Sequence, residues 1–548
     1  MIQPLYLDAN SAHSAGFSTA FHNFNWPIPQ DTYDSIAWGF INFLEDLMKG
    51  TELDENERLD LALSIVPIAN ESFFYAGSYM IIDSCIRDGR KYIFSDDCFY
   101  YQAISEYRLN PTNSLQHFLL QMQQNRQRGF RSKYLSSGRK ILDRYVLSIK
   151  SKKHRPNVYQ MTTNKLMKEW TISSKYISLR SLAATTGWGL EYIGQQRVVT
   201  AISDHIARRF VEMLRAHQFI IDDLFFEYMR QMCAIHLSIA RFWRNKNHEK
   251  YFDTSESILL TGTAGGFESR LLSHVFQRNN LPVIRFTHGA DRGLMNDYRW
   301  HYPELMFADY YLVHGHTEAK RVSEGIMRKT SSLTKKDINV IGVGSKFHNS
   351  IREHDSDSKS IDKVHDVMVV SSSFLGEIRP AFTQTSEEPV YLEWHLRLLE
   401  FLKGTKYNVI SKRHFKGSKT DKRLFTGFVN DELLGGGFSD MTTIADAFVF
   451  DFAASAFMEA LCTNKPVVLI DVPFRPLVQA GREQLEQICT VVRAEYDEHN
   501  KVIANFDEVK YGLQKPVNTI LRQEFLNDYL FAPSVNLSEF TDLIDRFN

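Results

Sequence analysis

The stretch DAFVFDFAASAFMEALCTNKPVVLID, at residues 446–471, has the clearest local pattern in the chain. An apolar run broken only by Asp451 gives way to small residues, then to helix-spaced apolar residues, and finally to a second apolar run. Short apolar runs of this kind are typical of strands buried in a parallel sheet. The stretch therefore predicts a strand, a tight turn, a helix and a second strand.

The turn inside this unit has the composition of a phosphate-binding turn. Its small residues end at Ser455, where the predicted helix begins, and the free amide groups of a helix N-terminus attract phosphate. Glu459 follows one helical turn later, where its carboxylate can accept hydrogen bonds from a ribose. The alternative is structural: Ser455 is then an ordinary helix cap and Glu459 a solvated helix residue.

This unit resembles the nucleotide-sugar half of two-domain (GT-B) glycosyltransferases. In that family a Ser-containing turn and the Glu of an E-A-L-x-x-x-K-P-V run hold the donor nucleotide. The resemblance extends over roughly residues 257–471 and is strongest to bacterial surface-carbohydrate transferases, including those that use CMP-activated ulosonic acids such as Kdo. The matching residues here are Ser455, Glu459, Ala460, Leu461, Lys465, Pro466 and Val467.

Length and composition limit the classes of protein that the chain can belong to. A chain of 548 residues predicts two or three domains, and 43% hydrophobic with 24% charged residues is typical of a soluble globular protein. The net charge of -1 gives no overall attraction to polyanions, so we expect no nucleic-acid partner. Five scattered cysteines without a C-x-x-C pair predict neither a zinc site nor a disulfide framework.

We expect a cytoplasmic location. The first residues lack the basic start and apolar core of a signal peptide, and no run approaches the ~18 apolar residues of a membrane span. The absence of a disulfide pattern fits a reducing compartment.

Alternation of strand and helix patterns from residue 257 onward predicts doubly wound parallel sheets. With the resemblance, it implies an α/β, GT-B-like fold of two Rossmann-like domains with a helical insertion in the first. We place the first, acceptor-side domain at residues 1–350 with the insertion at about 104–250, a polar linker at 351–363, and the nucleotide-sugar domain at 364–548. A C-terminal helical segment is expected to cross back to the first domain. Residues 3–8 and 91–94 predict two early strands, the first resembling the start of a nucleotide-type domain.

Ligands of such sheets bind beyond the carboxyl ends of the strands. In the second domain the predicted strand ends have hydroxyl, ammonium and imidazole groups, which suit a nucleotide phosphate. The Lys412-x-His414 turn resembles the K-x-H-P turn of the same transferases, in which the His contacts the donor phosphate, although Phe415 replaces the proline. The alternative for His414 is a cap on a strand end. The candidates for donor binding in this domain are Ser372, Ser373, Lys412, His414, Ser455 and Glu459.

The first domain has a glycine-rich turn, TGTAGG, after its predicted strand at residues 257–260. It is not a P-loop, because no G-K-[ST] follows, and its glycines are expected to let the backbone approach a ligand closely. Gly265 and Gly266 are therefore added to the nucleotide-sugar-binding candidates.

The loop from His288 to Gly293 resembles the H-G-G-x-x-G loop of the surface-carbohydrate transferases, with Ala290 in place of the second glycine. The P-E-x-x-x-A-D-x-x-x-x-x-G pattern that follows it in that family is met by Pro303, Glu304, Ala308, Asp309 and Gly315.

Three residues of this domain are the catalytic candidates: Asp291, Glu268 and His288. Glycosyl transfer passes through a cation-like state that a carboxylate stabilises, so Asp291 or Glu268 is expected to act as nucleophile or general base. We favour Asp291 of the two. The alternative is a purely structural pair between Asp291 and Arg292.

No D-x-D motif stands in a strand context, so we expect a reaction without a metal and without a cofactor other than the donor substrate. The stretch from Arg126 to Arg155 holds eleven cations against the single acid Asp143, with apolar residues among them. It predicts a peripheral membrane contact or an acidic-glycan contact, and the alternatives are a solvated face or a protein-docking surface.

Together these features predict a glycosyltransferase that moves a sugar from a nucleotide donor to a bacterial surface polysaccharide or its lipid-linked precursor. A CMP-linked ulosonic acid is the finer prediction for the donor. Two alternatives stay open: a nucleotide-sugar epimerase or glycerophosphotransferase of the same fold, and a non-catalytic glycan-binding assembly protein.

Overall fold

The computed structural model describes residues 3–109, 158–162, 164–173, 180–181, 200–246, 257–263, 265–328, 338–355, 363–383, 385–414 and 423–545. The basic stretch at residues 126–155 lies outside these ranges. Within them, no helix combines the length and the apolar character that crossing a bilayer requires.

Seven strands of the described chain form the C-terminal sheet, in the order β11-β10-β9-β12-β13-β14-β15, and only β15 runs antiparallel to its neighbour. The unit predicted at residues 446–471 is confirmed as β12 (Ala447–Phe450), α15 (Ser455–Leu461) and β13 (Val467–Asp471). The other elements of this domain are β9 (Asp366–Val370), α14 (Glu388–Lys403), β10 (Asn408–Lys412), β11 (Asp431–Leu433), η4 (Ser439–Met441), α16 (Gln479–Ile488), β14 (Thr490–Tyr496), β15 (Val502–Ala504) and α17 (Phe506–Gln514).

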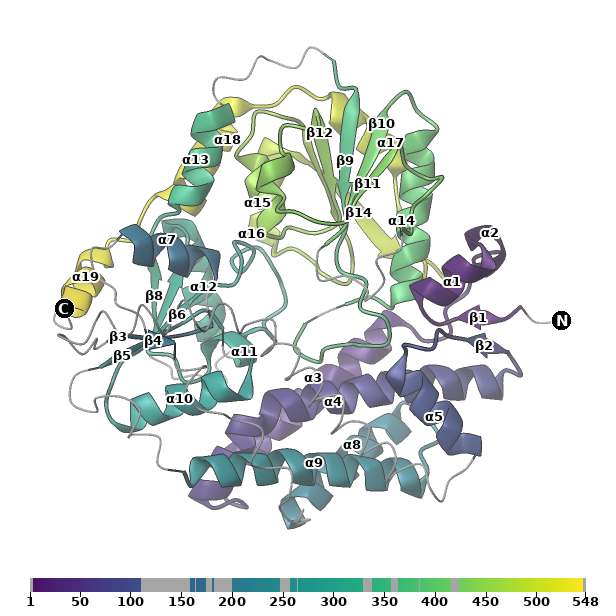
Figure 1. The fold of residues 1–548 in the computed structure, drawn as a ribbon, viewed down its shortest axis with the longest axis vertical. Helices are drawn as coiled ribbons and strands as arrows, with labels where there is room; N and C mark the ends of the chain where they lie inside the picture. The colour runs from purple at the N-terminus through teal and green to yellow at the C-terminus, as the bar shows by residue number, and fades with distance from the viewer. Residues whose placement is uncertain are drawn as a thin grey trace.

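Six described strands form the other large sheet, in the order β4-β3-β5-β6-β7-β8, and every neighbouring pair is parallel. Both sheets have helices on two faces (Figure 1), so two doubly wound, Rossmann-like domains are present, as predicted. The elements are β3 (Val158–Met161), α7 (Lys165–Ser173), β4 (Arg180–Ser181), β5 (Ile258–Thr261), α10 (Phe267–Arg278), β6 (Val283–Phe286), α11 (His301–Leu305), β7 (Tyr310–Val313), α12 (His316–Arg328), β8 (Asn339–Gly342) and α13 (Lys346–Asp355).

A layer of long helices lies at the base of the molecule in Figure 1, beneath the C-terminal domain. Two of these helices, α3 (Gln30–Lys49) and α4 (Glu55–Arg87), precede residue 104, so the helical part begins earlier than the insertion we predicted. The other two, α8 (Ala201–Ala216) and α9 (Asp223–Arg244), lie within it. Strand β3 also falls inside the predicted insertion, because its four residues are too few to show a strand pattern.

The first strand was predicted to open a nucleotide-type domain, and this is wrong. In the described chain, β1 (Leu5–Tyr6) pairs only with β2 (Tyr92–Ile93) and belongs to neither large sheet. The segment docks on the C-terminal domain instead: the amide of Ala9, the first residue of α1 (Ala9–Ala15), donates to Glu388 Oε2 at 2.7 Å. The N-terminal helices and one face of the C-terminal sheet consequently share one hydrophobic core. Helices α2 (Phe17–Ala20) and α5 (Phe99–Leu109) complete this part.

The C-terminal segment crosses back to the first domain, as expected. Helix α18 (Thr519–Leu526) continues into the π-helical turn η5 (Asn527–Phe531), and α19 (Leu537–Asp545) buries Phe540 and Ile544 against the N-terminal sheet. A Cβ atom at Gly315 would lie only 2.4 Å from the carbonyl oxygen of Tyr529, so this crossing requires a glycine there. The linker predicted at residues 351–363 begins inside α13, and most of its remainder lies outside the described residues.

Candidate functional site

The two domains meet at the carboxyl ends of their parallel strands. Leu294 of the first domain accepts a hydrogen bond at 2.8 Å from the amide of Val478, and the amide of Asn296 donates to the carbonyl oxygen of Pro476 at 2.9 Å. Met295 and Leu477 form an antiparallel bridge at the same place. The loop after β6 is thereby held against the loop after β13, so the edges where ligands of parallel sheets bind face one another.

Gly289 brings residues of both domains together. The Oδ1 atom of Asp291 and the Oγ atom of Ser455 both lie within 3.0 Å of the position that a Cβ atom at Gly289 would occupy. Any side chain at Gly289 would therefore clash with one or both. The glycine permits the carboxylate predicted to be catalytic to approach the first residue of α15, which was predicted to bind the donor.

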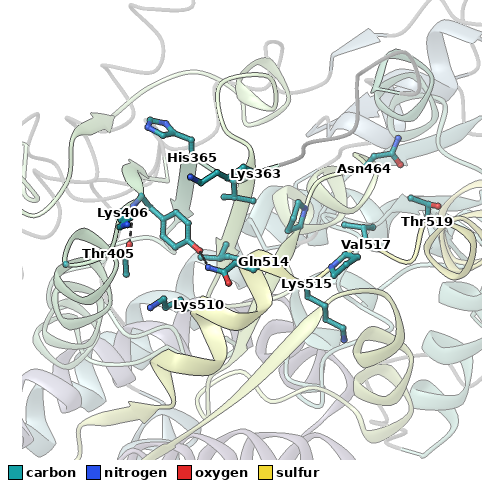
Figure 2. Close-up of a pocket in the computed structure, with 16 residues that line it drawn as sticks. Lys363, His365, Thr405, Lys406, Asn464, Lys510, Gln514, Lys515, Val517 and Thr519 are labelled. Carbon is teal, nitrogen blue, oxygen red and sulfur yellow. Dashed lines mark hydrogen bonds between the residues drawn. The ribbon is translucent and has the colours of Figure 1, made fainter.

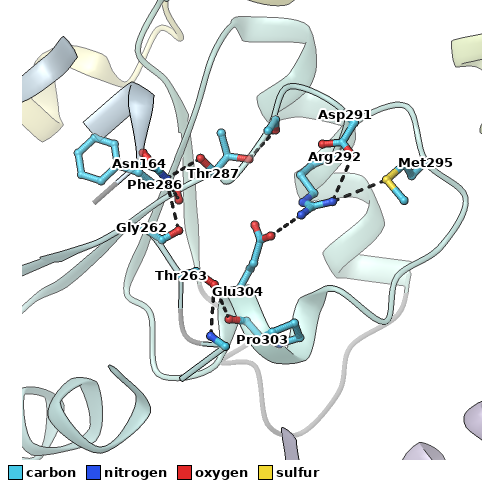
Figure 3. A network of polar contacts seen from close by, with 12 residues as sticks. Asn164, Gly262, Thr263, Phe286, Thr287, Asp291, Arg292, Met295, Pro303 and Glu304 are labelled. Atoms are coloured by element: carbon cyan, nitrogen blue, oxygen red, sulfur yellow. Dashed lines mark hydrogen bonds and ion pairs between the residues drawn. The ribbon is translucent and has the colours of Figure 1, made fainter. Parts of the chain in front are cut away.

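Asp291 also belongs to a buried polar network, drawn in Figure 3. Its Oδ2 atom lies 3.4 Å from Nη1 of Arg292, and the same guanidinium pairs with Glu304, whose Oε2 accepts a hydrogen bond from Tyr311 at 2.6 Å. Burial alone would raise the pKa of Glu304, but Arg292, together with His288 and Tyr311, holds this pKa below its ordinary value. The structural pair of Asp291 and Arg292 is therefore present, while Oδ1 of Asp291 lies beside Gly289.

The donor-side hydroxyls lie at the carboxyl end of β9. Ser373 Oγ is 2.8 Å from Nδ1 of His414, so the structure joins these two candidates. The amide of Ser372 donates to the Tyr391 hydroxyl at 2.6 Å, and that hydroxyl donates to Asp451. Burial raises the pKa of Asp451 to about 6. A small cavity of about 20 Å³ opens beside Ser372, Ser373, Ser386, Tyr391 and Arg475.

Arg475 is the residue of this site that sequence reasoning missed. It lies over the ring of Phe452 at 4.4 Å, and its charge interacts with Asp451 of its own domain and with Asp291 of the other. Burial lowers its pKa, and the two carboxylates oppose that shift. Arg475 follows β13 by four residues, so applying the strand-end rule to that strand would have found it.

Lys412 differs from its neighbours in the predicted donor site. Its side chain is buried, its Nζ atom donates to the carbonyl oxygen of Arg413 at 2.8 Å, and burial lowers its pKa. Among the described residues that line the small cavity, the cation is Arg475, and Lys412 is not one of them.

Glu459 is buried at the domain boundary and forms an interdomain ion pair. Its Oε1 atom lies 3.1 Å from Nζ of Lys165, at the start of α7 in the first domain. Its Oε2 atom lacks a hydrogen bond of ordinary geometry within the described chain. Burial raises the pKa of Glu459, and Lys165 opposes that shift. The carboxylate is thus not the solvated group that the alternative interpretation expected.

The other candidates lie in the first domain. His288 is exposed and its charge acts on Glu304, while Glu268, in the first turn of α10, interacts with Arg270. The amide of Gly265 donates to Thr263 Oγ1 at 3.2 Å.

Of the glycine-rich turn, Gly262 packs closely, since a Cβ atom there would lie 3.0 Å from Asn164 Nδ2, but Gly265 and Gly266 are not needed for internal packing. A Cβ atom at Gly265 or Gly266 would come no closer than 3.5 Å to the atoms around it. Close approach of this backbone to a ligand remains a prediction.

Metal ligands do not gather anywhere in the part of the chain that the structure describes, since no three His, Cys, Asp or Glu residues are placed to hold an ion. The five cysteines are buried and unpaired. A reaction without a metal stays a prediction.

Comparison with known proteins finds no matching family model and no matching curated protein. A Phytolacca americana UGT2, solved with UDP-2fluoro-glucose and pterostilbene, is similar at 10% identity and a TM-score of 0.32, covering 68% of this chain and 93% of that one. The glycotransferase of kitacinnamycin is similar at 12% identity and a TM-score of 0.35, covering 72% and 100%. Similarity this low supports no functional conclusion, and the fold rests on the strand topology described above.

Proposed function

We propose that this protein transfers a sugar from a nucleotide-activated donor to a carbohydrate acceptor, namely a bacterial surface polysaccharide or its lipid-linked precursor. The finer proposal for the donor is a CMP-linked ulosonic acid such as Kdo. The basic stretch at residues 126–155 is proposed to contact the acceptor or the membrane that bears it.

The observation that supports this proposal most is the meeting of Asp291 with Ser455 across the domain boundary. A transfer between two substrates needs a carboxylate from one side and phosphate-binding groups from the other, within reach of the same reacting carbon. Arg475, Ser373 and His414 are the phosphate-binding groups, and Arg475 lies close enough to Asp291 for their charges to interact.

In the proposed reaction, an acceptor hydroxyl oxygen bonds to the anomeric carbon while the bond from that carbon to the donor phosphate oxygen breaks. Asp291 takes the hydroxyl proton, and the phosphate leaves with the bonding electron pair. Arg475 and His414 meet the charge that develops on the leaving phosphate, which is the role of a metal ion in other transferases.

A panel of CMP, CDP, UDP and GDP tests the donor by thermal shift. A ligand that binds only the folded state stabilises it by about 2.7 kcal/mol at a hundredfold excess over its Kd, and CMP is expected to give the largest shift. A larger shift with UDP or GDP would contradict a CMP-linked ulosonic acid as the donor and leave the transferase proposal intact. An epimerised nucleotide sugar appearing without acceptor would contradict sugar transfer, and glycan binding without nucleotide binding would favour an assembly protein.

Replacing Glu459 or His414 by alanine is expected to weaken nucleotide binding by about 1.5–3 kcal/mol each, the scale of a charge-assisted hydrogen bond. The physical reason is that the proposal has Glu459 accept from the ribose and His414, which is bonded to Ser373 beside the small cavity, meet the phosphate. Calorimetric titration measures the affinity. Glu483→Ala and His499→Ala, at exposed positions of the same domain, are the matched controls. Loss of binding that appears only with a large fall in melting temperature would make both residues structural.

A further inference from the structure

A large cavity lies at the opposite, amino-terminal edge of the C-terminal sheet (Figure 2). Its volume is about 1040 Å³, and it is formed by the segment before β9, the turn between α14 and β10, the turn between α15 and β13, and the chain from the end of α17 to the start of α18. Because it adjoins the starts of the strands, it is separated from Asp291 and Arg475 by the length of the sheet. None of the residues assigned to sugar transfer lines it.

Among the described residues, the lining is positively charged and has no carboxylate. Four lysines line the cavity, Lys363, Lys406, Lys510 and Lys515, and none forms an ion pair with a carboxylate in the described residues. Two acids lie beside the cavity at the lining residue His365: Asp366 pairs with its ring at 3.2 Å, and Asp446 accepts from its amide at 2.9 Å. Four positive charges along one lining favour the approach of an anion.

The walls are held by hydrogen bonds, so the cavity is preformed. Arg522 of α18 donates from Nη1 to the carbonyl oxygens of Thr463 and Lys465, at 3.0 and 2.8 Å, and fixes the helix on the turn before β13. On the other side, Gln514 Nε2 donates to the Tyr407 hydroxyl at 3.1 Å, which ties α17 to the turn before β10. Binding an anion there requires little reorganisation of the backbone.

Exposed apolar side chains directly follow lining residues of the cavity in the chain. Tyr511 of α17 is 67% exposed and directly follows the lining residue Lys510, and Ile520 of α18 is 71% exposed and directly follows the lining residue Thr519. Leu521 is also exposed. Exposed apolar side chains would not contribute to the binding of a soluble anion. They would contribute to binding at a bilayer, where lipid phosphates can reach the lysines while aromatic and aliphatic groups enter the interfacial layer.

We propose that this surface, made of Lys363, Lys406, Lys510 and Lys515 with Tyr511 and Ile520, binds the protein to an anionic phospholipid membrane, with lipid phosphate in the cavity. The inference does not depend on the proposed sugar transfer. It also differs from a contact through residues 126–155, since it uses the C-terminal domain.

Co-sedimentation with vesicles of phosphatidylcholine, alone or mixed with phosphatidylglycerol, tests the proposal on the full chain. We expect binding to the mixed vesicles only, weakening as salt rises, because such attraction is screened over about 8 Å at physiological salt. The double variant Lys406→Glu, Lys510→Glu is expected to bind at least about tenfold more weakly. Lys320→Glu, Lys501→Glu is the control of equal charge change outside the cavity, and Arg139→Glu, Lys140→Glu, Arg144→Glu tests the basic stretch.

A second variant separates a membrane from a soluble anion. Tyr511→Ser, Ile520→Ser removes no charge and changes exposed positions, so folding is expected to persist while vesicle binding falls. Titration with pyrophosphate measures whether the same lysines bind a soluble anion. Binding of pyrophosphate through the lysines without binding of vesicles would overturn the membrane assignment. Vesicle binding that is insensitive to both double variants, or lost only with the basic stretch reversed, would overturn it as well. Nucleotide affinity, measured on the same variants, is expected to be unchanged, which keeps this test separate from that of sugar transfer.

Discussion

Replacing Asp291 by asparagine is expected to lower the rate of sugar transfer by about 10²–10⁴-fold, the usual contribution of a positioned general base. Asparagine keeps the shape of the side chain beside Gly289 but cannot take the proton of the acceptor hydroxyl. Folding should persist, because Arg292 keeps its ion pair with Glu304 and the hydrogen bond from Tyr311 to Glu304 is untouched. Single-turnover transfer with saturating donor and acceptor measures the rate.

Two further measurements make this result specific. Glu268→Gln is the matched comparison from the same domain, and its effect is expected to be much smaller, because Glu268 interacts with Arg270 in its own helix. The pH profile of kcat/KM should lose its acidic limb in Asp291→Asn, a change that a structural role would not produce. A normal rate in Asp291→Asn, or an equal loss in Glu268→Gln, would remove Asp291 as the base.

Replacing Arg475 by glutamine is expected to lower nucleotide affinity by about 10–100-fold, which corresponds to the loss of one charge-assisted contact to phosphate. Arg475 lines the cavity beside Ser372 and Ser373, and its charge interacts with Asp451 of its own domain and with Asp291 of the other. Without the cation, two carboxylates border the site and repel the phosphate.

The control for this variant is Arg493→Gln, an exposed position on β14 of the same domain. Calorimetric titration with the nucleotide that gave the largest thermal shift measures both proteins. The effect of Arg475→Gln should be larger than that of Lys412→Gln, because the Lys412 ammonium is already bonded to the carbonyl oxygen of Arg413. The reverse order would restore Lys412 as the phosphate-binding cation.

Local patterns predicted those parts of the fold whose stabilising contacts lie near in sequence. The β12–α15–β13 unit matches its prediction closely, since continuous apolar runs and a helix-spaced pattern report burial directly. Strand β1 was misassigned for the opposite reason: it was recognised as a strand, but its partner β2 and its support at Glu388 are distant in the chain. A strand pattern does not specify which sheet a strand enters.

The residues of the candidate site also fall into those that the sequence predicted and those that it did not. Asp291, Ser373, His414, Ser455 and Glu459 could be predicted because they follow strand ends or match family motifs. Arg475 has no motif, and its place depends on the course of the loop after β13. The pairing of Glu459 with Lys165 could not be predicted, because the two residues are far apart in the chain. The hydrogen bond from Lys412 to the carbonyl oxygen of Arg413 could not be predicted either, because it depends on how the side chain is buried.

Local residue patterns are enough to predict parallel α/β domains and the polar residues at their strand ends, because backbone period and side-chain burial are local properties. The packing of the folded chain is what brings Asp291 and Ser455 together at Gly289, places the charge of Arg475 within reach of one carboxylate from each domain, and gathers four lysines along one cavity at the far edge of the sheet. Those arrangements arise from the packing of two sheets and from the C-terminal crossing, and distances between segments so far apart in the chain are set by that packing alone.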